Sequence, residues 1–88
     1  MVRKDNMTRL TEIQKQAIER IRIIRDLQIR SIKEFVGEHV IPNQYVARYA
    51  LVHHHHMRRD TIDQLIRKGY LVERSSDVNG SEVGIASE

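Results

Sequence analysis

Residues 57–74 have the sequence MRRDTIDQLIRKGYLVER. Ile62, Leu65 and Ile66 recur in it at spacings of three and four, which places them on one face of a short helix. Gly69 follows, and glycine readily adopts the left-handed conformation in which many helices end. The next tripeptide, Tyr-Leu-Val, is apolar and favours β structure. This stretch therefore predicts a helix, a glycine stop and a strand.

The predicted helix is basic, because residues 58–68 contain four Lys and Arg against two acidic residues. A basic helix, a glycine stop, a strand and a further turn together resemble the recognition helix and wing of winged helix-turn-helix DNA-binding proteins, over about residues 30–87. The resemblance implies a mainly α fold: a long N-terminal helix plus a winged helix-turn-helix-like domain with two shorter helices and a small C-terminal β-hairpin. It also implies a small sequence-specific transcriptional regulator that acts as a dimer, with its third helix in the major groove of double-stranded DNA.

The exposed side of the third helix contains the candidate DNA contacts. With Ile62 in the middle of the buried face and 100° per residue, Asp60, Gln64 and Arg67 point most directly away from the core. Gln and Arg can bind adenine and guanine bidentately, and flanking Lys or Arg can bind phosphates. The two aspartates of this helix oppose that approach. The predicted DNA-binding residues are Arg58, Arg59, Thr61, Gln64, Arg67 and Lys68.

A long helix is predicted ahead of this region. Thr11 and Gln14 have the spacing of a capping box, although Thr8 could equally begin the helix one turn earlier. No Gly or Pro occurs between this point and Gly37. A helix over residues 12–36 would be about 37 Å long at a rise of 1.5 Å per residue. Its second half has the denser apolar pattern, so we expect that half to be the more deeply buried.

The apolar stripe of this helix is longer than so small a domain can cover. Either the helix breaks near residues 18–24, or its projecting first half packs against something outside the compact domain, for which a second copy is the obvious partner. We therefore predict a homodimer through residues 10–29 of the N-terminal helix. The alternating charges on the opposite side are typical of a solvated surface. An alternative function follows: a non-enzymatic protein-binding or assembly module that uses the long helix.

The segment between the long helix and the basic helix is predicted to contain one more helix. Pro42 suits the first turn of a helix, because its missing N–H would be unpaired there. Val46 and Ala50 are small enough to let another helix approach closely, as the first helix of a helix-turn-helix does. Residues 42–69 are therefore predicted to be helix-turn-helix-like.

Four histidines, His53 to His56, stand where the resembling families usually place a glycine and a small polar residue. Either they form the turn, with the recognition helix starting near Met57, or the second helix continues through them and Asp60 caps a shorter third helix. Four adjacent side chains do not converge on one point, and no Asp, Glu or Cys has ligand spacing with them. We expect no metal site.

An Asn-Gly pair at residues 79–80 is a strong signal for a hairpin, because both central positions of a type I′ turn need positive φ. A two-residue turn here would place Val72 on the same face as Val83. It would also place Asp77 opposite Glu82, a like-charge pair that would make the tip longer and looser.

Composition restricts the class of protein. The 88 residues are expected to form a single domain, with the elements in the order lead-in 1–7, long helix 8–37, helix-turn-helix-like segment 42–69 and hairpin 70–88. The chain has no cysteine, which excludes disulfides and thiolate metal sites. It has no apolar run of about 20 residues and no secretion signal, so we expect a soluble, cytoplasmic protein without a membrane partner.

Charge is distributed unevenly along the chain. The formal net charge is +3, and residues 1–37 hold nine Lys and Arg against five acids, whereas residues 69–88 hold one Arg against four acids. A polyanion should therefore meet the helices rather than the hairpin.

No catalytic constellation occurs in the sequence, so we expect no enzyme activity and no cofactor. The residues predicted to share one core are Ile32, Phe35, Val46, Ala50, Ile62, Leu65 and Ile66.

Overall fold

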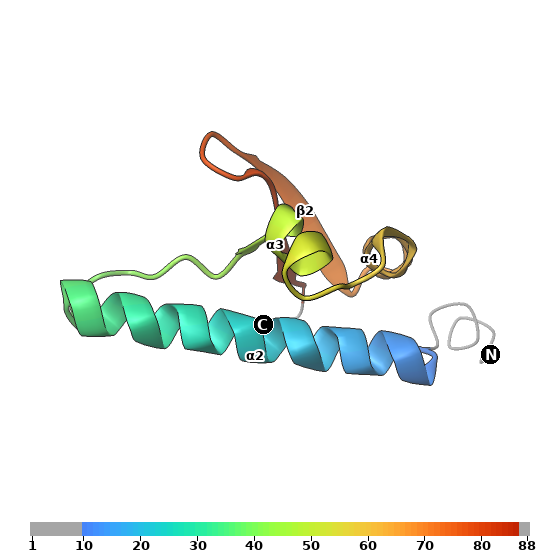
Figure 1. Ribbon diagram of the computed structural model, residues 1–88, viewed down its shortest axis with the longest axis horizontal. Coiled ribbons are helices and arrows are strands. Elements are labelled where there is room, and N and C mark those ends of the chain that lie inside the picture. The colour runs from blue at the N-terminus through green and yellow to red at the C-terminus, as the bar shows by residue number, and fades with distance from the viewer. Residues whose placement is uncertain (1–9, 87–88) are drawn as a thin grey trace.

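The computed structural model describes residues 10–86, so the predicted lead-in, Thr8 and residues 87–88 lie outside the described residues. The elements follow one another in this order: α2 (Glu12–Val36), β1 (Val46–Ala47), α3 (Arg48–His53), α4 (Arg59–Arg67), β2 (Leu71–Ser76) and β3 (Gly80–Ile85). Figure 1 shows α2 along one side of the molecule, with the other elements packed on one side of it. The long helix makes the molecule elongated, with principal extents of 47 × 26 × 22 Å.

Both ends of α2 are defined by local contacts. The Thr11 side chain accepts a hydrogen bond from the backbone N–H of Gln14 at 3.2 Å, and the Gln14 side chain accepts one from the backbone N–H of Thr11 at 3.1 Å, which confirms the capping box. The helix runs unbroken to Gly37, whose φ of 122° favours glycine. A Cβ at this position would also lie 2.8 Å from the His39 ring.

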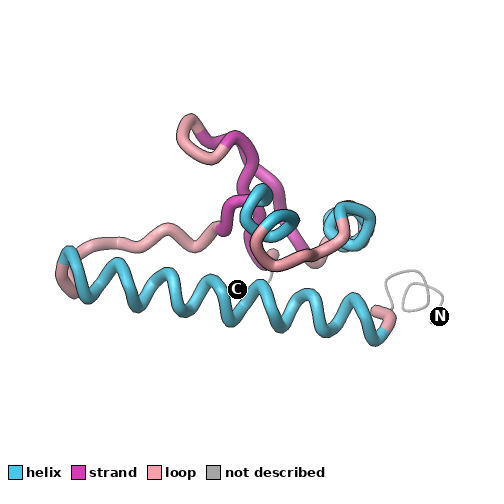
Figure 2. Tube along the Cα trace, viewed as in Figure 1, coloured by secondary structure: helices cyan, strands magenta, loops and turns pink. Residues whose placement is uncertain are grey.

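The first half of α2 is the buried half, so the prediction that the second half is more deeply buried was wrong. Gln14, Ala17 and Ile21 are buried, whereas Phe35 is 87% exposed. The reason is tertiary: α4, β1 and β3 all pack on α2, and the connector after Gly37 leads back along its second half (Figure 2). The half of α2 that projects from the compact domain is therefore the C-terminal half, not the N-terminal half as predicted.

The connector makes a turn at residues 38–40 and then has neither helix nor strand up to β1, so the predicted helix start at Pro42 was wrong. The Asn43 side chain accepts a hydrogen bond from the backbone N–H of Tyr45 at 3.0 Å, and the Gln28 side chain of α2 donates to the Tyr45 carbonyl at 2.9 Å. Val46 then pairs with Val83 as the start of a strand rather than a helix. Pairing with a strand from the far end of the chain is invisible to a local pattern.

The three strands form an antiparallel sheet in the order β1-β3-β2. Ser76 is opposite Gly80, so the hairpin loop contains residues 77–79, and the tip is longer than a two-residue turn, as the like-charge pair of that turn led us to expect. The Ser76 hydroxyl accepts hydrogen bonds from the backbone N–H groups of Val78 and Asn79 at 3.2 and 3.1 Å, which stabilise this longer loop.

The longer loop shifts the register of the hairpin. Val72 is opposite Gly84 and is largely exposed, so it lies on the other face of the sheet from Val83. Arg74, not Asp77, is opposite Glu82, and its Nε donates to the Glu82 carboxylate at 2.9 Å. The expected like-charge pair is replaced by an ion pair.

The core lies where α2, the two short helices and the sheet meet. Its buried members are Ala17, Ile21, Val46, Leu51, Met57, Ile62, Leu65, Leu71 and Val83. Among the predicted core residues, Val46, Ile62 and Leu65 are confirmed, and Ile66 packs against the cluster while partly exposed. Ile32 and Ala50 are only half-buried and lie outside this cluster. The prediction that Phe35 belongs to the core was wrong, because its side chain is exposed. Within residues 10–86, no helix has the length and apolar character needed to cross a bilayer.

Candidate nucleic-acid interface

His54 to His56 form the turn between α3 and α4, and His53 is the last residue of α3, so the first of the two interpretations is confirmed for three of the four histidines. The backbone N–H groups of His54 and His55 both donate to the Ala50 carbonyl, at 2.9 and 3.1 Å, and close the last turn of α3. His56 has a φ of 55°, a left-handed conformation in which side chains other than glycine are uncommon. Arg20 of α2 donates to the His55 carbonyl at 3.2 Å and ties the turn to the long helix.

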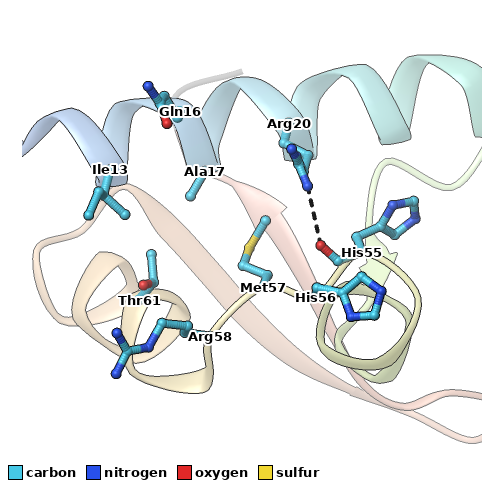
Figure 3. A pocket seen from close by; sticks show the side chains of 9 residues that line it. All are labelled: Ile13, Gln16, Ala17, Arg20, His55, His56, Met57, Arg58 and Thr61. Atoms are coloured by element: carbon cyan, nitrogen blue, oxygen red, sulfur yellow. Dashed lines mark hydrogen bonds between the residues drawn. The ribbon is translucent and has the colours of Figure 1, made fainter.

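The turn ends at Arg58, which occupies the N-cap position of α4. The helix therefore begins two residues after the predicted start near Met57, and Asp60 lies within it rather than at its cap. The Met57 side chain is buried and points from the turn toward α2 (Figure 3). This methionine anchors the turn in the core.

The side of α4 that faces the solvent is the side predicted from the helical spacing of its apolar residues. Ile62 and Leu65 are fully buried, which directs Asp60, Gln64 and Arg67 to the solvent, where all three are exposed. Nine residues at a rise of 1.5 Å give a helix of about 13 Å, between two and three turns.

Two predicted DNA-binding residues face α2 instead of the solvent. Thr61 is half-buried and lines a groove of about 180 Å³ between α2 and α4, where it faces Ile13 (Figure 3). Lys68 is half-buried, and its Nζ donates to the Gln14 side-chain oxygen at 2.8 Å. The structure thus separates Thr61 and Lys68 from the exposed set, which comprises Arg58, Arg59, Gln64 and Arg67.

Gln14 also positions Gln64. The buried amide of Gln14 donates to the Gln64 side-chain oxygen at 2.8 Å, so one end of this exposed side chain is held against α2. Gln14 therefore orients Gln64 of α4 and Lys68, the residue that follows this helix. Nothing in the sequence predicts this contact, because the partners are 50 and 54 residues apart.

Arg48, at the start of α3, clamps α4 to the hairpin. One guanidinium nitrogen lies 2.7 Å from Asp63 of α4 and the other lies 3.0 Å from Glu73 of β2. Burial by itself lowers the pKa of Arg48, but the hydrogen bonds and charges of Asp63 and Glu73 outweigh it and raise the pKa above its ordinary value. One guanidinium shared between two carboxylates leaves a net negative charge on this cluster, so Asp63 still opposes a polyanion, together with Asp60, but less strongly than a lone carboxylate would.

A second network holds the base of the hairpin. Glu82 is only 3% exposed, and its carboxylate accepts hydrogen bonds from Asn79 at 2.7 Å, Arg74 at 2.9 Å and Asn43 at 3.2 Å. The Asn79 hydrogen bond leads in lowering the pKa of Glu82, and Arg74 and Asn43 add to it against the effect of burial. The Arg74 guanidinium also lies 3.8 Å from the centre of the Tyr45 ring.

These networks change the electrostatics expected of the hairpin. Glu73 is paired with Arg48 and Glu82 is buried, which leaves Asp77 as the exposed acidic residue of the loop. Repulsion of a polyanion by the hairpin is therefore weaker than the sequence predicts.

Aromatic side chains of α3 lie near Arg59, one of the exposed arginines. The Tyr49 ring lies 4.3 Å from the His53 ring and 5.9 Å from the His54 ring, between ring centres. A hollow of about 220 Å³ beside them brings together α3, Arg59 of α4 and Asn79 and Ser81 of the hairpin. Among the described residues, no group of three or more His, Cys, Asp or Glu side chains is arranged to hold a metal ion.

Comparisons of this chain with protein-family models, with curated proteins and with solved structures gave no match.

Proposed function

We propose that this chain is a small sequence-specific DNA-binding protein, a transcriptional regulator that places α4 in the major groove of duplex DNA. The observation that carries the proposal is the accessible face of α4. Arg58, Arg59, Gln64 and Arg67 are exposed on a helix whose opposite face is fully buried. Anchoring one face in the core lets a short helix present the other face rigidly to a ligand.

The arrangement around α4 supports the same proposal. A short strand, two helices joined by a tight turn, and a hairpin whose second strand pairs with the short strand follow one another along the chain. The two short helices and the hairpin are parts that the resemblance to winged helix-turn-helix proteins implies, whereas the short strand is not among those predicted. The ion pair of Arg48 with Asp63 adds to this support, because it offsets part of the negative charge beside the exposed face.

The exposed side chains divide into two roles. Gln64 and Arg67 are the base-reading residues: Arg67 can bind guanine bidentately, and Gln64, whose side-chain oxygen accepts from Gln14, can donate to a base from its amide nitrogen. Arg58 and Arg59, at the N-terminal end of the helix, bind phosphates and set the position of the protein on the duplex. Thr61 and Lys68 do not contact DNA; they contact α2 and so help to hold α4 in place.

A salt titration tests the proposal. Fluorescence anisotropy with a random duplex at about 50 mM salt should show binding that weakens linearly, on logarithmic axes, as salt is raised. Arg59→Ala should lower the slope by about one and weaken all duplexes alike. On a preferred site selected from a random library, Gln64→Ala and Arg67→Ala should each lose about 1 to 3 kcal/mol and relax the preference for one base pair.

The matched control is Lys15→Ala, which removes one positive charge from an exposed position of α2 away from α4. It should leave the affinity close to that of the wild type. If the wild type binds no duplex below about 50 mM salt, where attraction to phosphates is strongest, the regulator proposal fails.

The alternative is a protein-binding or assembly module that uses α2. The observation that favours it is the exposure of large apolar side chains along that helix, Phe35 above all. A folded wild type without salt-dependent DNA binding would make this alternative the better account.

A further inference from the structure

The long helix α2 has a second apolar face that the domain does not cover. Ile23 is 51% exposed and Leu27 is 54% exposed, and the two lie one helical turn apart. With Ile24 they line a shallow hollow of about 410 Å³ on the side of the helix. Two more exposed apolar residues, Ile13 and Phe35, lie near the two ends of the helix.

Two kinds of side chain flank this face along its length. At 3.6 residues per turn, Glu19 and Arg30 are three turns apart and lie on one edge of the Ile23–Leu27 pair. Ile13 and Phe35 are about six turns apart and lie on the other edge.

The three pairs share one midpoint on the helix. The midpoint of Ile13 and Phe35 is residue 24, that of Ile23 and Leu27 is residue 25, and that of Glu19 and Arg30 falls between them. The central apolar pair (Ile23 and Leu27), the outer apolar pair (Ile13 and Phe35) and the charged pair (Glu19 and Arg30) are thus arranged symmetrically about one point of the helix.

We propose that a second copy of this chain covers the face, with the two α2 helices antiparallel about a two-fold axis near residues 24 and 25. A two-fold axis brings together residues at equal distances on either side of it. Glu19 then meets Arg30 of the second copy, and Phe35 meets Ile13 of the second copy, each contact being made twice. A parallel pair would instead place Glu19 beside Glu19 and Arg30 beside Arg30.

The surroundings of the face fit this occupant. Ile13 is one wall of the groove in Figure 3, so the hollow beside it can receive the ring of Phe35 from the second copy. Arg20, the cation nearest the centre of the face, is turned toward the His55 carbonyl at 3.2 Å. The contact would extend about 33 Å along α2, from residue 13 to residue 35. It would therefore use the full length of α2, including the C-terminal half that the domain leaves exposed. This dimer goes beyond DNA binding and does not depend on it.

Charge reversal tests the proposal. Sedimentation equilibrium of the full chain at micromolar concentrations should show a dimer. Glu19→Arg and Arg30→Glu should each weaken it about tenfold or more, because each creates two like-charge contacts across the axis. The double variant, Glu19→Arg with Arg30→Glu, should restore the dimer.

Mixing the two single variants should also restore a dimer, made of one copy of each, because both of its charge contacts are then between opposite signs. Asp77→Arg reverses an exposed charge in the hairpin loop, which lies away from α2 in Figure 1, and should leave the dimer unchanged. Leu27→Asp should give a monomer whose helix content by circular dichroism matches that of the wild type.

A wild type that is monomeric with its helix intact would overturn the proposal. A dimer that survives Leu27→Asp would do the same. Failure of the double variant and of the mixture to recover would refute the antiparallel pairing. None of these measurements involves DNA, so they stand apart from the test of the proposed function.

Discussion

Replacement of the buried carboxylate at the base of the hairpin, Glu82→Gln, tests how the hairpin is attached to the domain. The carboxylate accepts one hydrogen bond on Oε1, from Arg74, and two on Oε2, from Asn43 and Asn79. Glutamine keeps one oxygen, which can still accept from Arg74. Its amide nitrogen is a donor and would face the two asparagine amides, which are donors as well.

The expected cost follows from those two lost hydrogen bonds. Each is worth about 1.5 to 3 kcal/mol when the acceptor is charged, so the free energy of unfolding should fall by about 3 to 6 kcal/mol. For a domain of this size, a loss of about 3 kcal/mol lowers Tm by about 12 to 24 °C. Thermal and urea unfolding followed by circular dichroism, at one protein concentration, measure both quantities.

The same replacement should change the pH dependence of stability. The folded pKa of Glu82 lies below its ordinary value of 4.5, so the unfolded chain binds the proton more readily. The contribution of this carboxylate is therefore complete above about pH 4.5 and is lost as the pH falls through the folded pKa. Between those limits, the stability of the wild type should fall more steeply with decreasing pH than that of Glu82→Gln.

Asp77→Asn is the matched control, because it makes the same chemical change at an exposed position of the hairpin loop. It should alter stability by less than about 0.5 kcal/mol. If Glu82→Gln also costs less than about 0.5 kcal/mol and leaves the acid slope unchanged, the buried network does not hold the hairpin in the way that its geometry indicates.

Three further replacements or additions test other parts of the molecule. Leu65→Ala should cost about 2 to 5 kcal/mol in urea unfolding, because Leu65 is fully buried, and a cost below about 0.5 kcal/mol would remove it from the core. His56→Gly should raise the free energy of unfolding by up to about 1 kcal/mol, because the φ of 55° is strained for histidine; a destabilised variant would contradict that turn geometry. Isothermal titration with zinc should show only weak binding, and a chelator should leave Tm unchanged; a tight stoichiometric site coupled to folding would refute the expectation that His53 to His56 hold no metal.

The features predicted correctly from the sequence are those set by neighbours within a few positions along the chain. Thr11 and Gln14 cap α2 through contacts three residues apart, and Gly37 ends it through its own backbone conformation. The buried side of α4 follows in the same way from the spacing of Ile62 and Leu65. Local hydrogen bonds and helical period do not depend on where the rest of the chain lies, so they can be identified without it.

Strand pairing could not be predicted in this way. A two-residue turn and a three-residue loop both agree with the alternation of the hairpin sequence, and a change of register reverses which side chains face the core. Ser76 capping the loop and Arg74 opposite Glu82 select the register that the structure has. Similarly, β1 forms because Val46 pairs with Val83, a residue 37 positions further along the chain.

For the candidate interface, the helical period determined which side chains of α4 point outward, and tertiary contacts determined which of them are available. Arg58, Arg59 and Arg67 are exposed as predicted, whereas α2 takes up Lys68 and one end of Gln64 through Gln14. Arg48 reaches Asp63 and Glu73 across 15 and 25 residues, and so offsets part of a negative charge that the sequence alone leaves exposed. The direction of a side chain on a helix is a property of the helix, but its electrostatic partners depend on which segments the fold brings beside it.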